Sequence, residues 1–169
     1  MPPDLPPDSR LNQHLRHLLT QQRVAALGTL DDDGAPFVSM VPFAVDAINA
    51  TLVIHVSLLA PHTRHLLARP RVSLLVMQTE IEDAPVLALP RVTLRGQADA
   101  LEVDSGPWAD AKRAYLARFP DAEPTTHFGD FRFIGIAVET ARQVSGFGAA
   151  RSLNATELAT VLSPLLKIH

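Results

Sequence analysis

The strongest constraint on the fold is a series of short apolar segments, rich in Val, Ile, Leu and Thr, that polar turn signals separate. Six of these segments have the length of β-strands, and they cover residues 24–30, 36–45, 51–57, 71–79, 90–103 and 131–147. The first two flank Asp-Asp-Asp-Gly at 31–34, which is typical of a hairpin turn. Because most connections are brief, the pattern favours an antiparallel sheet over a parallel one.

Four other segments have the apolar spacing of short helices, at residues 10–22, 61–69, 106–119 and 155–162. Two strand positions carry irregular signals: Pro42 indicates an edge or a bulge, and Gly96 indicates a bulge or bend. We therefore predict an α+β, mainly β fold, a six-stranded antiparallel barrel with short peripheral helices. It is predicted to form a single domain over residues 10–169, after a proline-rich flexible leader at residues 1–9.

The composition excludes several classes of function. The 169 residues include no cysteine, which removes disulfides, thiolate metal sites and cysteine nucleophiles. A net charge of -3 gives no basic field for nucleic acid. No apolar run reaches the ~20 residues that cross a bilayer, and the start lacks a secretory signal, so we expect a cytoplasmic protein. With 47% hydrophobic and 20% charged residues, the chain is expected to hide apolar surface against a second copy of itself.

The segment 57–65 (SLLAPHTRH) joins a predicted strand to a predicted helix. Ser57, Thr63 and Arg64 could add hydroxyls and a guanidinium to the free amides of a helix start, a combination that suits a phosphate. The alternative is an ordinary helix start with a solvated arginine, which this segment alone favours. His62 and His65 have a spacing that can hold a metal, but no third ligand is evident, and no metal site is predicted.

Two predicted strands carry polar residues that either face solvent or line a binding pocket. Arg91, Thr93 and Arg95 share one face of their strand, which is either exposed or lines an anion pocket, and exposure is favoured from this segment alone. Ser39 has the same ambiguity in the segment VSMVPF. His55 is interpreted as a hydrogen-bonded wall residue. Motifs for nucleotide cradles, zinc hydrolases and serine hydrolases do not occur in the sequence.

Taken in order, four segments resemble the pyridoxamine 5′-phosphate oxidase-like flavoproteins, and more narrowly the haem-utilisation-related branch of that superfamily. They are RVAALGTLDDDGAPFVSMVPF, HVSLLAPHTRHLLARPRVSLLV, PRVTLRGQA and RFPDAEPTTHFGDFRFIGIAVETARQVSGFGAARSL. The resemblance runs from about Leu15 to Leu153. It implies an FMN-binding split barrel, built as a homodimer with two flavin sites at the subunit interface.

The resemblance also implies which residues hold FMN. The strand at 39–43 would run beside the isoalloxazine, the segment around Ser57 would hold the phosphate, and Arg91 would assist. The turn at Gly146–Phe147 would approach the partner's flavin or the dimer seam. The FMN-binding residues predicted in this way, together with the anion-pocket interpretation, are Ser39, Met40, Val41, Pro42, Ser57, His62, Thr63, Arg64, Arg91 and Thr93.

The function expected from the resemblance is that of an FMN-dependent oxidoreductase whose substrate and catalytic residues are unknown. The alternatives are a non-catalytic flavin- or haem-binding protein of haem utilisation, with haem as the small-molecule partner, and a structural dimer with a decayed pocket. The chain departs from the family in three places. It has His65 where many relatives have Asn, it lacks the carboxy-terminal Arg–His substrate motif of the true oxidases, and its one late histidine is His169.

Overall fold

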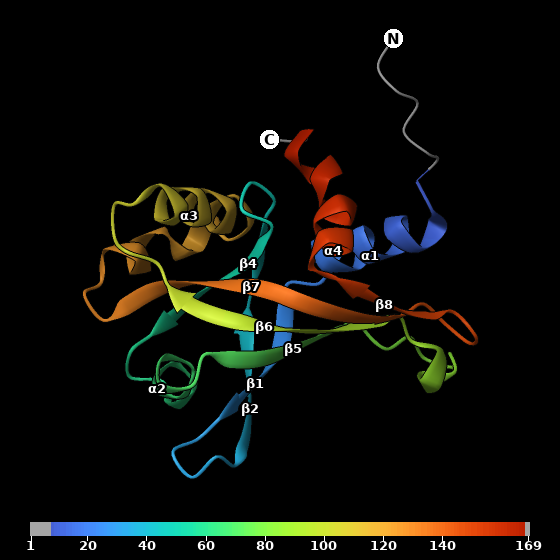
Figure 1. The fold of residues 1–169 in the computed structure, drawn as a ribbon, viewed down its shortest axis with the longest axis horizontal. Coiled ribbons are helices and arrows are strands. Elements are labelled where there is room, and N and C mark those ends of the chain that lie inside the picture. The colour runs from blue at the N-terminus through green and yellow to red at the C-terminus, as the bar shows by residue number, and fades with distance from the viewer. Residues whose placement is uncertain (1–7, 168–169) are drawn as a thin grey trace.

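The computed structural model describes residues 8–167, and the predicted leader at 1–9 lies mostly outside this range. One antiparallel sheet of eight strands, curled into a half-barrel, forms its centre (Figure 1). Seven strands are paired in the order β2-β1-β5-β6-β7-β4-β3, and β8 pairs with β7. The strands are β1 (Val24–Leu30), β2 (Pro36–Pro42), β3 (Ala44–Asp46), β4 (Thr51–Ser57), β5 (Arg71–Met77), β6 (Arg91–Ala100), β7 (Phe131–Val144) and β8 (Ala150–Asn154).

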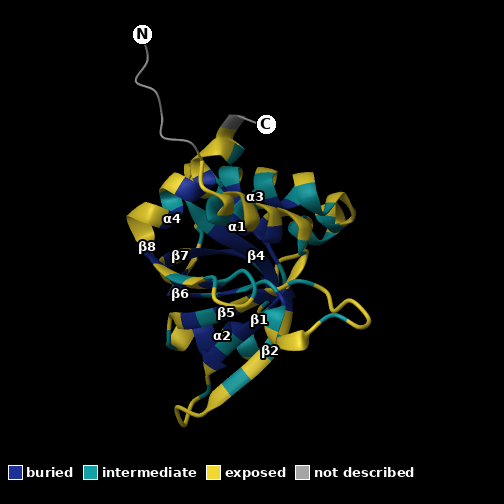
Figure 2. Cartoon of the chain, turned by 90° about the vertical axis from the view of Figure 1, so that its right-hand side faces the viewer, coloured by how far each residue is buried: buried dark blue, intermediate teal, exposed yellow. Residues whose placement is uncertain are grey.

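The α-helices that the structure describes around the sheet are α1 (Arg10–Gln21), α2 (Pro61–Ala68), α3 (Gly106–Arg118) and α4 (Ala155–Leu162). In the described residues the 3-10 helices are η1 (Val86–Ala88), η2 (Pro120–His127) and η3 (Ser163–Lys167). In Figure 2, α1, α3 and α4 gather at one end of the curled sheet and α2 lies at the other end. None of the helices between residues 8 and 167 is long and apolar enough to cross a membrane.

Helices α1, α2 and α4 close the inside of the curl. Leu15 and Leu19 of α1, Leu66 of α2 and Leu158 of α4 join one buried cluster with the inner side chains of the strands. On the other face, α3 packs over β3, β4 and the adjacent part of β7, in a second cluster around Tyr115. The rest of that face, over β2, β1, β5 and β6, has no described helix on it. We call this the outer face.

The predicted α+β split-barrel class is confirmed, with two differences in the strands. The segment predicted at 36–45 is broken at Phe43, which is fully buried and donates its amide to the carbonyl of Arg23 at 3.2 Å. Because Pro42 has no amide proton for a ladder, β2 ends there as an edge strand, and the chain then pairs with β4 as β3.

The second difference is β8 (Ala150–Asn154), which lies between the final strand predicted at 131–147 and the helix predicted at 155–162 and was not predicted as a strand. A tight turn follows Ser145, whose amide donates to the carbonyl of Ala149 at 2.8 Å. Gly146 and Gly148 have φ angles of 115° and 73° in this turn, a region that favours glycine. The chain therefore reverses and returns along β7.

The bulge expected at Gly96 is present, since the pairing of β6 with β7 shifts register between Arg95 and Gly96. A Cβ on Gly96 would stand 2.1 Å from the carbonyl oxygen of Ala137. The bulge therefore requires glycine, and it sets which side chains of β7 face outward beyond it.

Candidate functional site

The outer face is apolar over β2, β1 and β5. Alternation along the strands points Val38, Met40, Leu75 and Met77 away from the core. Val38 is 68% exposed and Met40 is 64% exposed, a high exposure for two large apolar side chains that lie close together in one strand. Large exposed apolar patches of this kind mark surfaces that another molecule covers.

The same face becomes basic over β6, β7 and β8. The register places Thr93 opposite Arg142 and Leu75, and Arg95 opposite Thr140. A shallow hollow of about 530 Å³ lies here, and a second of about 440 Å³ extends from β6 and β7 over β5 and β1. Arg95 lines both, and Glu139 also lines the second. Within residues 8–167, no carboxylate lies within ion-pairing distance of Arg91, Arg95 or Arg142. The face therefore offers cations and hydroxyls to an anion beside an apolar surface.

The segment predicted to bind phosphate lies at the junction of β4 and α2. The hydroxyl of Ser57 donates to Asp130 Oδ2 at 2.9 Å and accepts from the amide of Leu59. Thr63 is fully buried and its hydroxyl has no hydrogen-bond partner in the described residues. Arg64 is exposed, with Nε 3.9 Å from Asp32 Oδ2. Pro61 has no amide proton, and the amides of Thr63 and Arg64 already donate to the carbonyl of Ala60. The start of α2 therefore offers few free amides to an anion, and Arg64 is a solvated cation.

The β2 residues named from the resemblance are divided between the two faces. Met40 points outward, whereas Ser39 and Val41 point toward the inside of the curl and Pro42 ends the strand. The Ser39 hydroxyl is buried without a hydrogen-bond partner among the described residues. β2 therefore presents a thioether, and no polar group, to the outer face.

The predicted residues form two separate groups within one chain. Ser57 pairs with Phe131 at one end of β7, while Arg91 pairs with Val144 at the other end. At about 3.3 Å per residue, the two ends are roughly 40 Å apart along the strand. Arg91 is moreover engaged locally, because its Nη1 donates to the carbonyls of Leu87 and Leu89. Arg91 and Thr93 therefore belong to the outer face, and Ser57, His62, Thr63 and Arg64 to the α2 junction.

Two of the histidines are structural. His55 stacks on Phe133, with ring centroids 4.3 Å apart, and its Nδ1 lies 3.4 Å from the hydroxyl of Thr125. Burial, with a smaller effect of the Lys112 charge, lowers the pKa of His55 to about 4. His65 is buried beside the hydroxyl of Thr29, 3.2 Å from its Nδ1. Neither imidazole faces a site that a ligand could enter.

The other imidazoles are more accessible. His62, on α2, is only partly buried, and burial, together with the neighbouring His65, lowers its pKa. His127 is exposed and bound to Glu123 at 2.8 Å. His14 and His17 of α1 line a hollow of about 380 Å³ at the rim of the sheet. The sequence analysis did not single out these two residues, and their spacing in RLNQHLRHLLTQ was the available signal.

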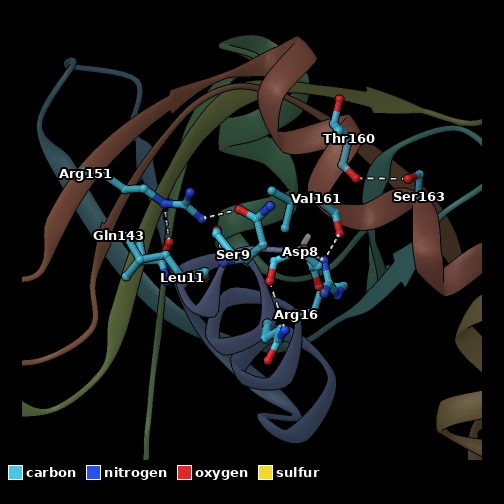
Figure 3. Close-up of polar contacts among 11 residues, drawn as sticks. Asp8, Ser9, Leu11, Arg16, Gln143, Arg151, Thr160, Val161 and Ser163 are labelled. Atoms are coloured by element: carbon cyan, nitrogen blue, oxygen red, sulfur yellow. Dashed lines mark hydrogen bonds and ion pairs between the residues drawn. The ribbon is translucent and has the colours of Figure 1, made fainter. Parts of the chain in front are cut away.

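Helix α1, which carries His14 and His17, is fastened to the sheet by polar contacts (Figure 3). Buried Gln143 donates to the carbonyl of Leu11 at 2.9 Å and accepts from Arg151 Nε at 2.8 Å. Arg16 donates to the carbonyl of Val161 at 3.0 Å and pairs with Asp8. The start of the helix is therefore held at a fixed position over β7 and α4.

The other end of α1 is held by one arginine from α3. Arg118 donates to the carbonyls of Leu19, Thr20 and Gln22, and its guanidinium lies 5.1 Å from the ring centroid of Phe43. Burial lowers the pKa of Arg118, and the Arg23 charge adds to this effect. Since the helix carbonyls and a cationic side chain complement one another, Arg118 caps α1 and fixes its C-terminal turn.

Comparison with known proteins places this geometry in a family. A family model described as pyridoxamine 5′-phosphate oxidase matches residues 11–145. The non-canonical haem oxygenase HOZ of Arabidopsis thaliana, a chloroplastic protein, is 39% identical over 140 residues, which cover 82% of this chain and 41% of that protein. Haem oxygenase HutZ of Vibrio cholerae is 27% identical over 88% of this chain and 84% of its own length.

The fold is also similar to a solved structure. A haem-binding protein from Mycobacterium smegmatis superposes with a TM-score of 0.80 at 29% identity, over 90% of this chain and 61% of that chain. This chain therefore spans less than two thirds of two of the relatives it matches.

The prediction of FMN as the cofactor is wrong. HOZ, HutZ and the M. smegmatis protein, which each match at least 82% of this chain, are named as haem oxygenases or as a haem-binding protein, and none of these names refers to a flavin. Within one chain, Arg91 and Thr93 lie far along the sheet from the α2 junction and form no single phosphate site with it.

The family itself was identified correctly from the sequence segments. The matched region of 11–145 contains β1 to β7 and the helices between them, and the two most informative relatives act in haem metabolism by name. The chain belongs to the pyridoxamine 5′-phosphate oxidase family, in its haem-utilisation branch.

Proposed function

We propose that this protein binds haem and acts in haem utilisation. The observation that carries the proposal is the agreement of the relatives: a protein 39% identical over 82% of this chain and a structural neighbour with a TM-score of 0.80 are both named for haem. This proposal corresponds to the alternative drawn from the sequence, and it replaces the flavin-dependent oxidoreductase as the main interpretation.

The outer face supports this proposal chemically. Haem has a broad apolar ring and two carboxylates on one edge, so it needs an apolar surface next to cations. Leu75 and Met77 of β5 supply apolar surface. Arg95 lies on the neighbouring strand β6 and Arg142 on the next strand, β7, and neither has a described carboxylate in ion-pairing distance. In this proposal the two arginines hold the carboxylates through charge-assisted hydrogen bonds.

We also propose that the protein is a homodimer that buries the apolar half of the outer face. Val38 and Met40 are more than half exposed in one chain, and a second copy would cover them. A haem on the adjacent basic half would then lie at the edge of the interface. The predicted cytoplasmic location stays a prediction.

The proposed haem site is tested by titrating the purified protein with haemin and following the Soret band. We expect saturable binding by the wild type and a loss of about 1.5–3 kcal/mol of binding free energy for each of Arg95→Ala and Arg142→Ala, because each removes a charged hydrogen bond. The control is Arg113→Ala, which removes an exposed arginine that already pairs with Asp110 on α3. Equal affinity of all four proteins would contradict the placement on the outer face.

Haem degradation is a second candidate function. The observation that favours it is the sequence identity to two proteins named haem oxygenases. Incubation of the haem-loaded protein with ascorbate and O₂ tests it. Decay of the Soret band with release of carbon monoxide supports the oxygenase, and a stable haem complex supports binding or storage alone.

A further inference from the structure

The α3 hollow is a cavity between α3, the turn that joins β3 to β4, and η3. Its volume is about 390 Å³, within the range of small-ligand sites, which is roughly 300–1,000 Å³. None of its described lining residues lies on β1, β2, β5 or β6. The hollow is therefore separate from the outer face.

Small side chains on α3 leave this space open. Ala114 and Ala117 are three residues apart, so they share one face of the helix, and both line the hollow. The neighbouring Ala111 and Tyr115 are instead buried in the second cluster, which holds α3 against β3 and β4. The hollow is thus a fixed feature of the way α3 packs, and a larger side chain at position 117 would fill it.

Apolar side chains form the walls opposite α3. Ile48 of the β3–β4 turn is 57% exposed and Leu166 of η3 is 46% exposed, and both line the hollow. A neighbouring hollow of about 380 Å³ shares Val45, Ala114 and Ala117 with it, so the apolar surface continues along α3. A ligand with an apolar body would remove this surface from water.

Two carboxylates are held in fixed positions at the hollow. Asp46 is 3% exposed and accepts hydrogen bonds from the backbone amides of Ile48 and Asn49. The side-chain amide of Asn49 donates to Asp46 Oδ2 at 2.7 Å and to Asp110 Oδ2 at 3.3 Å. The turn is therefore joined to α3 by Asn49, and both Asp46 and Asp110 line the cavity.

The described lining of the hollow has an excess of negative charge. Arg113 is the one cation among the described lining residues, and its Nη2 donates to Asp110 Oδ1 at 2.7 Å. Among the side chains that the structure describes, no cation lies within ion-pairing distance of Asp46. Since two carboxylates face one guanidinium, a ligand with a positive charge is favoured over one with a negative charge.

We propose that the α3 hollow binds a small amphipathic cation, an amine in its ammonium form with a short apolar chain. The ammonium group lies beside the carboxylates of Asp46 and Asp110. The apolar chain packs on Ala114 and Ala117 and extends toward the neighbouring hollow. This inference does not rest on haem binding, because the α3 hollow and the outer face share no described residue.

The test is a titration of the full chain with n-octylammonium chloride, followed through the backbone amide signals by heteronuclear NMR. We expect saturable shifts at Ile48, Ala114 and Ala117. Ala117→Trp fills the hollow and should weaken binding at least about tenfold. Asp110→Asn keeps the shape of the side chain but removes one carboxylate, and it should also weaken binding about tenfold or more, as expected for a lost charged hydrogen bond.

Matched controls separate the site from general effects of bulk and charge. Ala109→Trp adds the same bulk at an exposed position of α3 outside the hollow, and Asp99→Asn removes an exposed carboxylate of β6. Both variants should keep the wild-type affinity. n-Octyl sulfate has the same chain with the opposite charge and should bind at least about tenfold more weakly than the ammonium probe.

Three results would overturn the inference. They are the absence of saturable shifts at the hollow, equal affinity for the two octyl probes, and wild-type affinity in Ala117→Trp. Equal affinity for the two probes would show an apolar groove without preference for a cation. Circular dichroism spectra like that of the wild type establish that each variant is folded.

Discussion

The fastening of α1 gives a quantitative prediction for the variant Gln143→Met. The Gln143 side chain is 1% exposed and makes three hydrogen bonds, to the Leu11 carbonyl at 2.9 Å, to Ser145 Oγ at 2.8 Å and from Arg151 Nε at 2.8 Å. Methionine keeps the length of the side chain but removes all three bonds. A bond to a charged group contributes about 1.5–3 kcal/mol and a neutral one about 1 kcal/mol. Because Ser145 and Arg151 can regain some bonds to water, we expect a net loss of about 2–4 kcal/mol.

Equilibrium unfolding in urea, followed by circular dichroism at a fixed protein concentration, measures this loss. The control is Gln97→Met, which removes an exposed bond to Glu139 and should change the free energy of unfolding by less than about 0.5 kcal/mol. Hydrogen exchange should also become faster in the amides of α1 in Gln143→Met. A loss below about 1 kcal/mol, with unchanged exchange, would refute the claim that Gln143 fixes this helix.

Three further changes test separate parts of the structure. Gly96→Ala should lower the free energy of unfolding in urea by about 3 kcal/mol or more, because the new Cβ would stand 2.1 Å from a carbonyl oxygen of β7. The control Gly28→Ala, whose new Cβ would have its nearest neighbour at 3.5 Å, should lower it little. Equal losses in the two variants would contradict the bulge geometry. Folding lowers the pKa of His55 from 6.5 to about 4. Between these two pH values the unfolded chain binds a proton at His55 and the folded chain does not. The free energy of unfolding should therefore fall by about 2–3 kcal/mol as the pH drops from 6.5 to 4. It should fall less in His55→Phe. An equal fall with pH in both proteins would exclude His55 as the cause. Met40→Asp should convert the proposed dimer to a monomer, as measured by light scattering, because the change would bury a charge in the apolar interface. The control Leu59→Asp, at a residue that is 85% exposed and lies outside the outer face, should remain a dimer. A dimeric Met40→Asp variant would contradict the proposed interface.

Local sequence pattern was sufficient for most elements of this fold. The strands at 24–30 and 51–57 and the helix at 155–162 have their predicted bounds, because clear turn or cap residues delimit them. Ser9 and Asn154 are N-caps, and Asn154 forms a capping box with Glu157. Because these signals depend on residues close in the sequence, they indicate the element bounds without knowledge of the tertiary contacts.

The features that sequence pattern missed depend on pairing between distant residues. Only the tertiary burial of Phe43 shows that β2 must end and β3 begin, and only the reversal after Ser145 reveals β8. The candidate site has the same limit. The register of β7 separates Arg91 from Arg64, and no local signal indicates that one face of α1 would border the ends of β5 and β6 with His14 and His17. The sequence segments were sufficient to identify the family, but proteins of one fold bind different ligands, so the fold does not by itself identify the ligand.

The central claim is that this split barrel binds haem and does not bind the flavin expected from its family. Equilibrium dialysis of the purified wild-type protein against equimolar haemin and FMN tests it most directly, with the absorption spectrum of the retained fraction as the readout. The account predicts a saturable Soret band and no retained flavin. Retention of FMN with no haem bound to the folded protein would contradict it.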